Sequence, residues 1–209
     1  MKRLNRRRLV SGGALILAGA AFALGLSFLG SHHAVARPGV ERGLAPLAIG
    51  NLQQRFAVLS RRHSNQCGLA GSNFRTLAQD GRLQGSCCSA MVYSEYVRQI
   101  HGLKRYATVS EVPADPYDIS VGLATRLVGY DRSITLTPSQ QRVYDQAKKL
   151  SHEHGPCCCQ CWRWTAFGGQ AKELITRRRY TAAQIAHVWD LEDGCGGGAG
   201  GPPGSMMMS

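Results

Sequence analysis

Cysteine is the residue type in this chain most able to do chemistry, and four cysteines lie within one short stretch. Residues Ser151–Trp164 read SHEHGPCCCQCWRW, so Cys157, Cys158, Cys159 and Cys161 follow two histidines, His152 and His154. Neighbouring residues are too close along the backbone to bridge each other easily, since their Cα atoms are about 3.8 Å apart and disulfides need roughly 4.4–6.8 Å. A shared metal ion would use such closely spaced sulfurs directly.

The spacing Cys158-x-x-Cys161 is typical of a metal knuckle, in which a short turn directs two sulfurs at one ion. Cys87 and Cys88, or Cys67 with His63, would supply a second pair of ligands. The Met91 thioether suits Cu(I), whereas imidazole suits zinc or copper. We therefore expect a copper or zinc ion as cofactor, copper first, with ligands drawn from Cys67, Cys87, Cys88, Met91, His154, Cys157, Cys158, Cys159, Cys161 and His63.

Two other uses of the cysteines stay open. Eight cysteines are an even number, and they allow 105 pairings in a disulfide-stapled structural or interaction domain. The Cys158-x-x-Cys161 pair would also serve thiol–disulfide redox chemistry, although such pairs usually accompany a βαβ pattern, which we do not find. Trp162 follows Cys161 where covalent haem attachment requires histidine.

The first 36 residues resemble an export signal. Lys2, Arg3 and Arg6–Arg8 precede an uncharged stretch, Leu9–Gly30, and Ala34-Val35-Ala36 provides a small-residue cleavage site. Arg6-Arg7-Arg8-Leu9-Val10 is similar to a twin-arginine signal. If it is not cleaved, the uncharged stretch is long enough to anchor the chain in a membrane. Both interpretations place the remaining chain outside the cytoplasm, in a periplasmic, cell-surface or secreted location that permits disulfides.

Charge argues against a nucleic-acid partner. The leader holds five of the 25 basic residues and no acidic ones, which leaves 20 basic against 13 acidic residues, a net charge of +7. The densest basic run, Arg177-Arg178-Arg179, is short and typical of a solvated helix end. Membrane contact is expected only through an uncleaved N-terminal segment.

The rest of the chain predicts an all-α fold, a single compact domain of five to six short helices with cysteine clusters at the helix junctions. Residues 37–50 read as a linker, 51–193 as the helical Cys-rich domain, and 194–209 as a flexible Gly/Met tail. Capping residues and apolar spacing predict helices that begin near Asn51, Ser86, Pro116, Thr137, Cys161 and Thr181. Cys87, Cys88 and the later cluster would then open helices, where the helix dipole favours thiolate.

Three short patches resemble a group of secreted bacterial proteins that carry a Pro-Cys-Tyr-Cys-Gly-Cys motif. They are HSNQC (residues 63–67), CCSAM (87–91) and GPCCCQC (155–161). The order differs, because the Pro-Cys patch comes last here, and Cys158 and Gln160 replace the aromatic residue and the glycine of the motif. The resemblance implies an exported bacterial protein whose cysteines converge in space.

These observations predict an extracytoplasmic protein that binds a soft metal for delivery or sequestration. Its partners would be the metal ion and a membrane or extracytoplasmic metalloprotein. Hydrolase, kinase and dehydrogenase motifs are missing from the sequence, which favours binding over catalysis.

Overall fold

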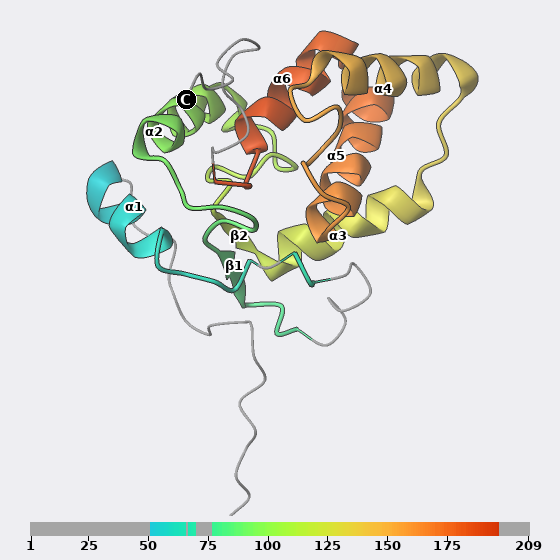
Figure 1. The fold of residues 1–209 in the computed structure, drawn as a ribbon. Helices are drawn as coiled ribbons and strands as arrows, with labels where there is room; N and C mark the ends of the chain where they lie inside the picture. The colour runs from blue at the N-terminus through green and yellow to red at the C-terminus, as the bar shows by residue number, and fades with distance from the viewer. Residues whose placement is uncertain (1–50, 66, 70–76, 197–209) are drawn as a thin grey trace, which may run out of the picture. The chain divides into compact units, whose positions relative to one another are not determined.

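The computed structural model describes residues 51–65, 67–69 and 77–196, which form a mostly helical domain (Figure 1). This confirms the predicted all-α fold class, with a small two-stranded sheet in addition. The helices of the described part are α1 (Leu52–Leu59), α2 (Tyr93–Leu103), α3 (Val121–Ser133), α4 (Pro138–Leu150), α5 (Trp162–Arg178) and α6 (Ala182–Glu192). A 3₁₀ turn, η2 (Lys104–Tyr106), follows α2.

Local capping residues set three of the helix starts that the sequence predicts correctly. Thr137 and Thr181 each form a complete capping box, with Gln140 and Gln184 respectively, and these boxes begin α4 and α6. The Asn51 side chain accepts from two backbone N–H groups at the start of α1. These side chains satisfy backbone donors that the helix itself leaves without partners.

Two predicted helix starts are wrong. The second helix begins at Tyr93, because the hydroxyl of Ser86 donates to the carbonyl of Ser89 and the residues after it pair with another segment. The third begins at Val121, where Ser120 caps the helix. Cys87 and Cys88 therefore lie in an irregular segment before α2, and the helix-dipole argument does not apply to them.

The core is built around α5, which packs against α3, while α4 packs against α6 (Figure 1). Gly169 lets α3 and α5 approach closely, since a Cβ atom there would lie 2.1 Å from the Leu127 carbonyl oxygen. Trp162, Phe167 and Trp189 are fully buried or nearly so in this core. The first of them begins α5 directly after Cys161, so the cysteine cluster is attached to the best-packed helix.

The two strands, β1 (Arg82–Gln84) and β2 (Asp118–Ser120), pair in antiparallel fashion, with Leu83 opposite Ile119. Buried ion pairs tie the sheet to its neighbours. Arg55 of α1 binds Asp115 (2.5 Å) and Asp118 (3.2 Å), and Arg82 also pairs with Asp118. The sheet and its ion pairs thus fix the backbone of residues 82–86, which leads into the segment that carries Cys87 and Cys88.

The predicted export signal, with its uncharged stretch, and the predicted linker lie outside the described residues. Within the described residues, none of the helices combines the length and the apolar character that crossing a bilayer requires. The predicted tail begins at Gly194, yet Gly194, Cys195 and Gly196 are part of the folded domain and bond to residues 87–92. The remainder of that tail lies outside the described residues.

Candidate metal centre

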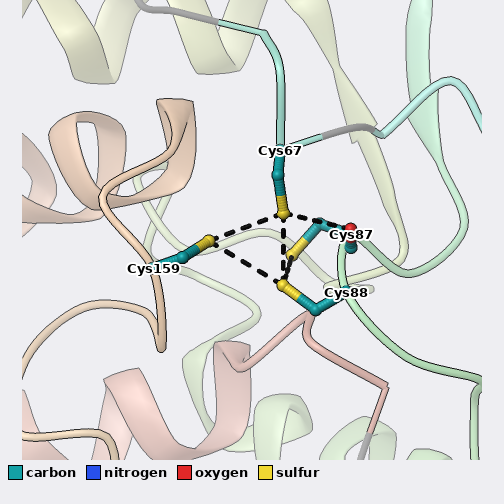
Figure 2. A group of neighbouring side chains, drawn as sticks. All are labelled: Cys67, Cys87, Cys88 and Cys159. Atoms are coloured by element: carbon teal, nitrogen blue, oxygen red, sulfur yellow. Dashed lines mark hydrogen bonds between the residues drawn. The ribbon is translucent and has the colours of Figure 1, made fainter.

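All eight cysteines gather at one place, although they come from four separate segments of the chain. Six of them are free thiols: Cys67, Cys87, Cys88, Cys157, Cys159 and Cys161. The other two, Cys158 and Cys195, form a disulfide. Figure 2 shows four of the free cysteines with their sulfur atoms turned toward one another.

Ser64 and Asn65 position the segment that carries Cys67. The Ser64 hydroxyl donates to the Arg82 carbonyl (3.1 Å), and the Asn65 amide Nδ2 donates to the Gly85 carbonyl (2.7 Å). The indole Nε1–H of Trp162 donates to Asn65 Oδ1 (3.0 Å), which connects this segment to the start of α5. Ser64 and Asn65 therefore connect the sheet to the start of α5, directly after the Cys157–Cys161 loop.

Cys87 and Cys88 are held by backbone hydrogen bonds to the end of the described chain. The backbone N–H of Cys87 donates to the Gly194 carbonyl (3.0 Å), and that of Ser89 donates to the Cys195 carbonyl (2.8 Å). Gly85 makes the turn into this segment with φ of +89°, and a Cβ atom there would meet the Arg62 carbonyl oxygen at 1.8 Å. Only glycine fits both the left-handed backbone and this close approach.

The loop from 151 to 161 carries the remaining sulfurs. The Ser151 hydroxyl accepts from the Gly155 N–H (2.9 Å), and Gly155 packs against the Trp164 ring. Cys161 is the N-cap residue of α5, and its carbonyl accepts from the Trp164 N–H (3.1 Å). The loop is thus fixed at both ends, by α4 and by α5.

The sulfurs form overlapping groups with the proximity that metal ligation requires. Within each group, the sulfur atoms lie within 4.8 Å of one another. The groups are Cys67, Cys87, Cys88 and Cys159; Cys87, Cys157, Cys159 and Cys161; and Cys88, Cys158 and Cys195. The third group contains the disulfide, so the first two are the ones that hold free thiols.

Neighbouring thiols and burial shift the cysteine pKa values in different directions. The pKa of Cys161 is lowered because the thiols of Cys157 and Cys87 donate hydrogen bonds to its sulfur. The bond to Cys161 raises the pKa of Cys157, hydrogen bonds to Cys157 and Cys161 raise the pKa of Cys87, and burial raises the pKa of Cys88 and Cys159. Raised pKa values favour the protonated thiol at these four cysteines, so a metal ion bound there would have to displace their protons.

Arg163 places a positive charge next to these sulfurs. Its side chain is fully buried, and its guanidinium donates to the carbonyls of Pro116 (2.9 Å) and Glu192. The charge of Arg163 acts to lower the pKa of both Cys87 and Cys157. A buried cation here stabilises any anionic state of the sulfur cluster.

The structure brings together the seven cysteines among the predicted ligands, and the two predicted histidines lie outside their groups. In the described part of the chain, the groups in which histidine, cysteine or carboxylate ligand atoms lie within 4.8 Å of one another consist of cysteines alone. Met91 is buried in an apolar cluster with Leu59, Tyr96, Ile100 and Tyr117. His63 and His154 are exposed. The donor set is therefore all sulfur.

Cys195 joins the sulfur cluster although the sequence interpretation left it out of the ligand set. It is 3% exposed, and its sulfur lies 3.7 Å from that of Cys157 and 3.9 Å from that of Cys87. Its surroundings, GCGGGAGG, have the composition of a flexible tail. The even cysteine count is the one signal in the sequence that points to Cys195. The other seven cysteines cannot all pair among themselves, so one of them needs Cys195 as its partner.

Comparisons with protein-family models, with curated proteins and with solved structures give no match to this chain.

Proposed function

We propose that this protein is an extracytoplasmic soft-metal-binding protein that holds zinc or copper(I) through clustered thiolates, for delivery or sequestration. The observation that carries the proposal is the first group of sulfurs, from Cys67, Cys87, Cys88 and Cys159. Three segments separated by up to 92 residues bring these four sulfurs together, and neighbouring pairs lie 3.2–3.8 Å apart. Gathering four partly exposed thiols gives little packing benefit, whereas thiolate is a preferred ligand for both ions.

The all-sulfur donor set changes the order of the two metals. A thioether from Met91 was the main reason to favour copper, and that side chain packs in an apolar cluster instead. Four thiolates in tetrahedral reach are typical of zinc. Zinc is therefore the first expectation and copper(I) the second.

The twin-arginine-like leader supports the extracytoplasmic location. That route carries folded passengers, so a metal centre assembled before export would reach an oxidising compartment with its thiolates already bound. Metal ligation would protect those thiolates from oxidation there.

The competing function is a disulfide-stapled structural domain, and the Cys158–Cys195 bridge favours it for that one pair. Redox chemistry by the Cys158/Cys161 pair has less support, because Cys158 bonds to Cys195 while Cys161 lies 3.8 Å from Cys157, sulfur to sulfur.

Metal analysis combined with intact mass distinguishes these functions. The protein without its leader would be purified anaerobically, and its bound metals and alkylatable thiols counted before and after chelation. We expect bound zinc or copper and six thiols that become reactive only after chelation. Eight half-cystines with no bound metal would establish the disulfide framework instead.

A further inference from the structure

We propose that the six free cysteines hold two metal ions in one binuclear thiolate centre, with Cys87 and Cys159 bridging the two ions. This inference rests on the proposed metal-binding function and specifies the number of ions and the role of each sulfur. It starts from the overlap of two four-sulfur groups, which share Cys87 and Cys159 and no other residue.

The union of the two groups coincides with the set of free thiols. The first group adds Cys67 and Cys88 to the shared pair, and the second adds Cys157 and Cys161. Two four-coordinate ions need eight sulfur bonds. Six sulfurs supply eight bonds when two of them each bind both ions, because a thiolate sulfur has more than one lone pair.

The distances fit tetrahedral ligation. Metal–sulfur bonds of about 2.3 Å give sulfur–sulfur edges of about 3.8 Å around a tetrahedral ion. In the first group, Cys88 lies 3.2 Å from Cys67, 3.4 Å from Cys87 and 3.8 Å from Cys159, sulfur to sulfur. In the second group, the Cys157–Cys161 edge is 3.8 Å. Small adjustments of side-chain torsions would open the shorter edges.

A single ion explains less of the structure. One four-coordinate ion in the first group would leave Cys157 and Cys161 as buried thiols in contact with each other. Two independent sites would need eight separate sulfurs, and the Cys158–Cys195 disulfide removes two of them. Sharing is the arrangement that uses all six free sulfurs.

The charge around the site fits such a centre. Two Zn²⁺ ions with six thiolates leave two negative charges, which are costly to bury without a positive partner. Arg163 is fully buried and next in the chain but one to Cys161, and its guanidinium lies against Gly194, the neighbour of Cys195. It is placed to offset part of that charge.

Cobalt substitution of the full protein without its leader tests this arrangement. Co²⁺ would be titrated anaerobically into the metal-free protein, with the disulfide intact, and followed by native mass spectrometry and magnetic susceptibility. We expect two Co²⁺ ions per chain with a susceptibility per ion below that of isolated Co²⁺, because bridging thiolates couple the two spins.

Each other outcome has a separate meaning. One ion per chain, or two uncoupled ions, would overturn the binuclear centre and leave the proposed metal-binding function intact. No bound Co²⁺, Zn²⁺ or Cu⁺ would overturn both.

Variants assign the roles of the sulfurs. Cys67→Ser and Cys161→Ser each remove one non-bridging ligand, so each should lower tight binding from two ions to one, whereas Cys159→Ser should weaken both ions. His154→Asn is the matched control in the same loop, since asparagine tolerates the φ of 52° there and the imidazole lies outside the sulfur groups. Equal losses for Cys67→Ser and Cys159→Ser, in variants whose circular dichroism is unchanged, would contradict the bridging role.

Discussion

At the scale of single residues, Asn65 controls how the sulfur-bearing segments meet. It is 1% exposed and joins the Cys67 segment to Gly85, the residue after β1, through the Gly85 carbonyl and to α5 through the Trp162 indole. A polar side chain buried in this way is costly to remove, because its former partners stay buried.

We expect Asn65→Ala to lower the free energy of unfolding by about 2–3 kcal/mol and to weaken metal binding, because Cys67 loses its fixed position. Urea unfolding and competition with a chelator measure the two effects. Gln53→Ala, on the exposed face of α1, is the control and should change neither. Metal affinity equal to wild type in Asn65→Ala would show that the sulfurs position themselves.

Glu192 makes stability depend on pH. Its carboxyl is fully buried, and this burial raises its pKa to about 8, although Gln170 donates to it (2.6 Å). The folded state therefore keeps this proton over a range in which the unfolded chain has lost it. The resulting stability is complete below the ordinary pKa of glutamate and is lost as pH rises through about 8.

Glu192→Gln should flatten this pH dependence. We expect wild type to lose on the order of 3–5 kcal/mol between pH 4.5 and pH 9 from this group, whereas the variant loses none of that contribution. Urea unfolding of the metal-free proteins across this range provides the measurement. Parallel pH profiles for the two proteins would show that Glu192 ionises normally when folded.

At the scale of elements, the contact between α3 and α5 depends on a glycine. A Cβ atom at Gly169 would lie 2.1 Å from the Leu127 carbonyl oxygen and 2.5 Å from the Asp131 amide nitrogen. Both are backbone atoms, so the helices themselves would have to separate. Since α5 begins at the cysteine loop, that separation would also move Cys161.

Gly169→Ala should destabilise the domain by about 1–3 kcal/mol through overpacking. Gly129→Ala is its matched control on α3, because its Cβ would meet nothing within 4 Å. There the gain in helix propensity should stabilise by about 0.5–1 kcal/mol. Melting temperatures of the two variants should therefore move in opposite directions, and a shift in the same direction would contradict the close helix contact.

Helix starts that depend on neighbouring residues were predictable from the sequence, whereas elements defined by distant pairing were not. The starts of α4 and α6 followed from Thr137 and Thr181, because a capping box uses only neighbouring residues. Ser86 carried a similar signal, yet its segment pairs with Gly194–Gly196, residues about a hundred positions away. The three-residue strands give no periodic signal of their own, and pairing with each other defines them.

The candidate site was predictable only in part, because local sequence signals do not show how distant segments pack together. Cysteine density indicated convergence, but grouping into shared and unshared sulfurs depends on how distant loops pack. His154 and Met91 lie close in sequence to cysteines, yet the imidazole belongs to none of the sulfur groups and Met91 packs in an apolar cluster. Cys195 shows the opposite case: its Gly-rich neighbours predict a flexible tail, yet the residue is buried among the other cysteines.

At the scale of the whole molecule, the metal centre is expected to act as a cross-link. The sulfurs belong to separate segments that lie mostly outside the helices and strands and that meet at this point. A ligand that binds only the folded state stabilises it in proportion to the logarithm of its concentration. Metal content and folding stability should therefore change together.

Zinc at a free concentration of 100 times its dissociation constant should raise the free energy of unfolding by about 2.7 kcal/mol. Chelation should reverse this gain, and so should acidification, because the thiolates take up protons that compete with the metal. Urea titrations with zinc and with a chelator measure the difference, and Cys159→Ser should show a smaller one. An equal gain in that variant would mean that the stabilising zinc binds elsewhere.

In the proposed two-ion centre, the unequal exposure of the six thiols would make one ion exchange faster than the other. Cys67 and Cys88 face solvent, whereas Cys157 and Cys161 are enclosed by the core. A thiolate from an acceptor protein can attack only at the outward end, so ligand exchange must start with the ion held there. The outer ion would then be the one that is transferred. The inner ion would stay bound and hold the cysteine-bearing loops in position, so that a new outer ion could bind.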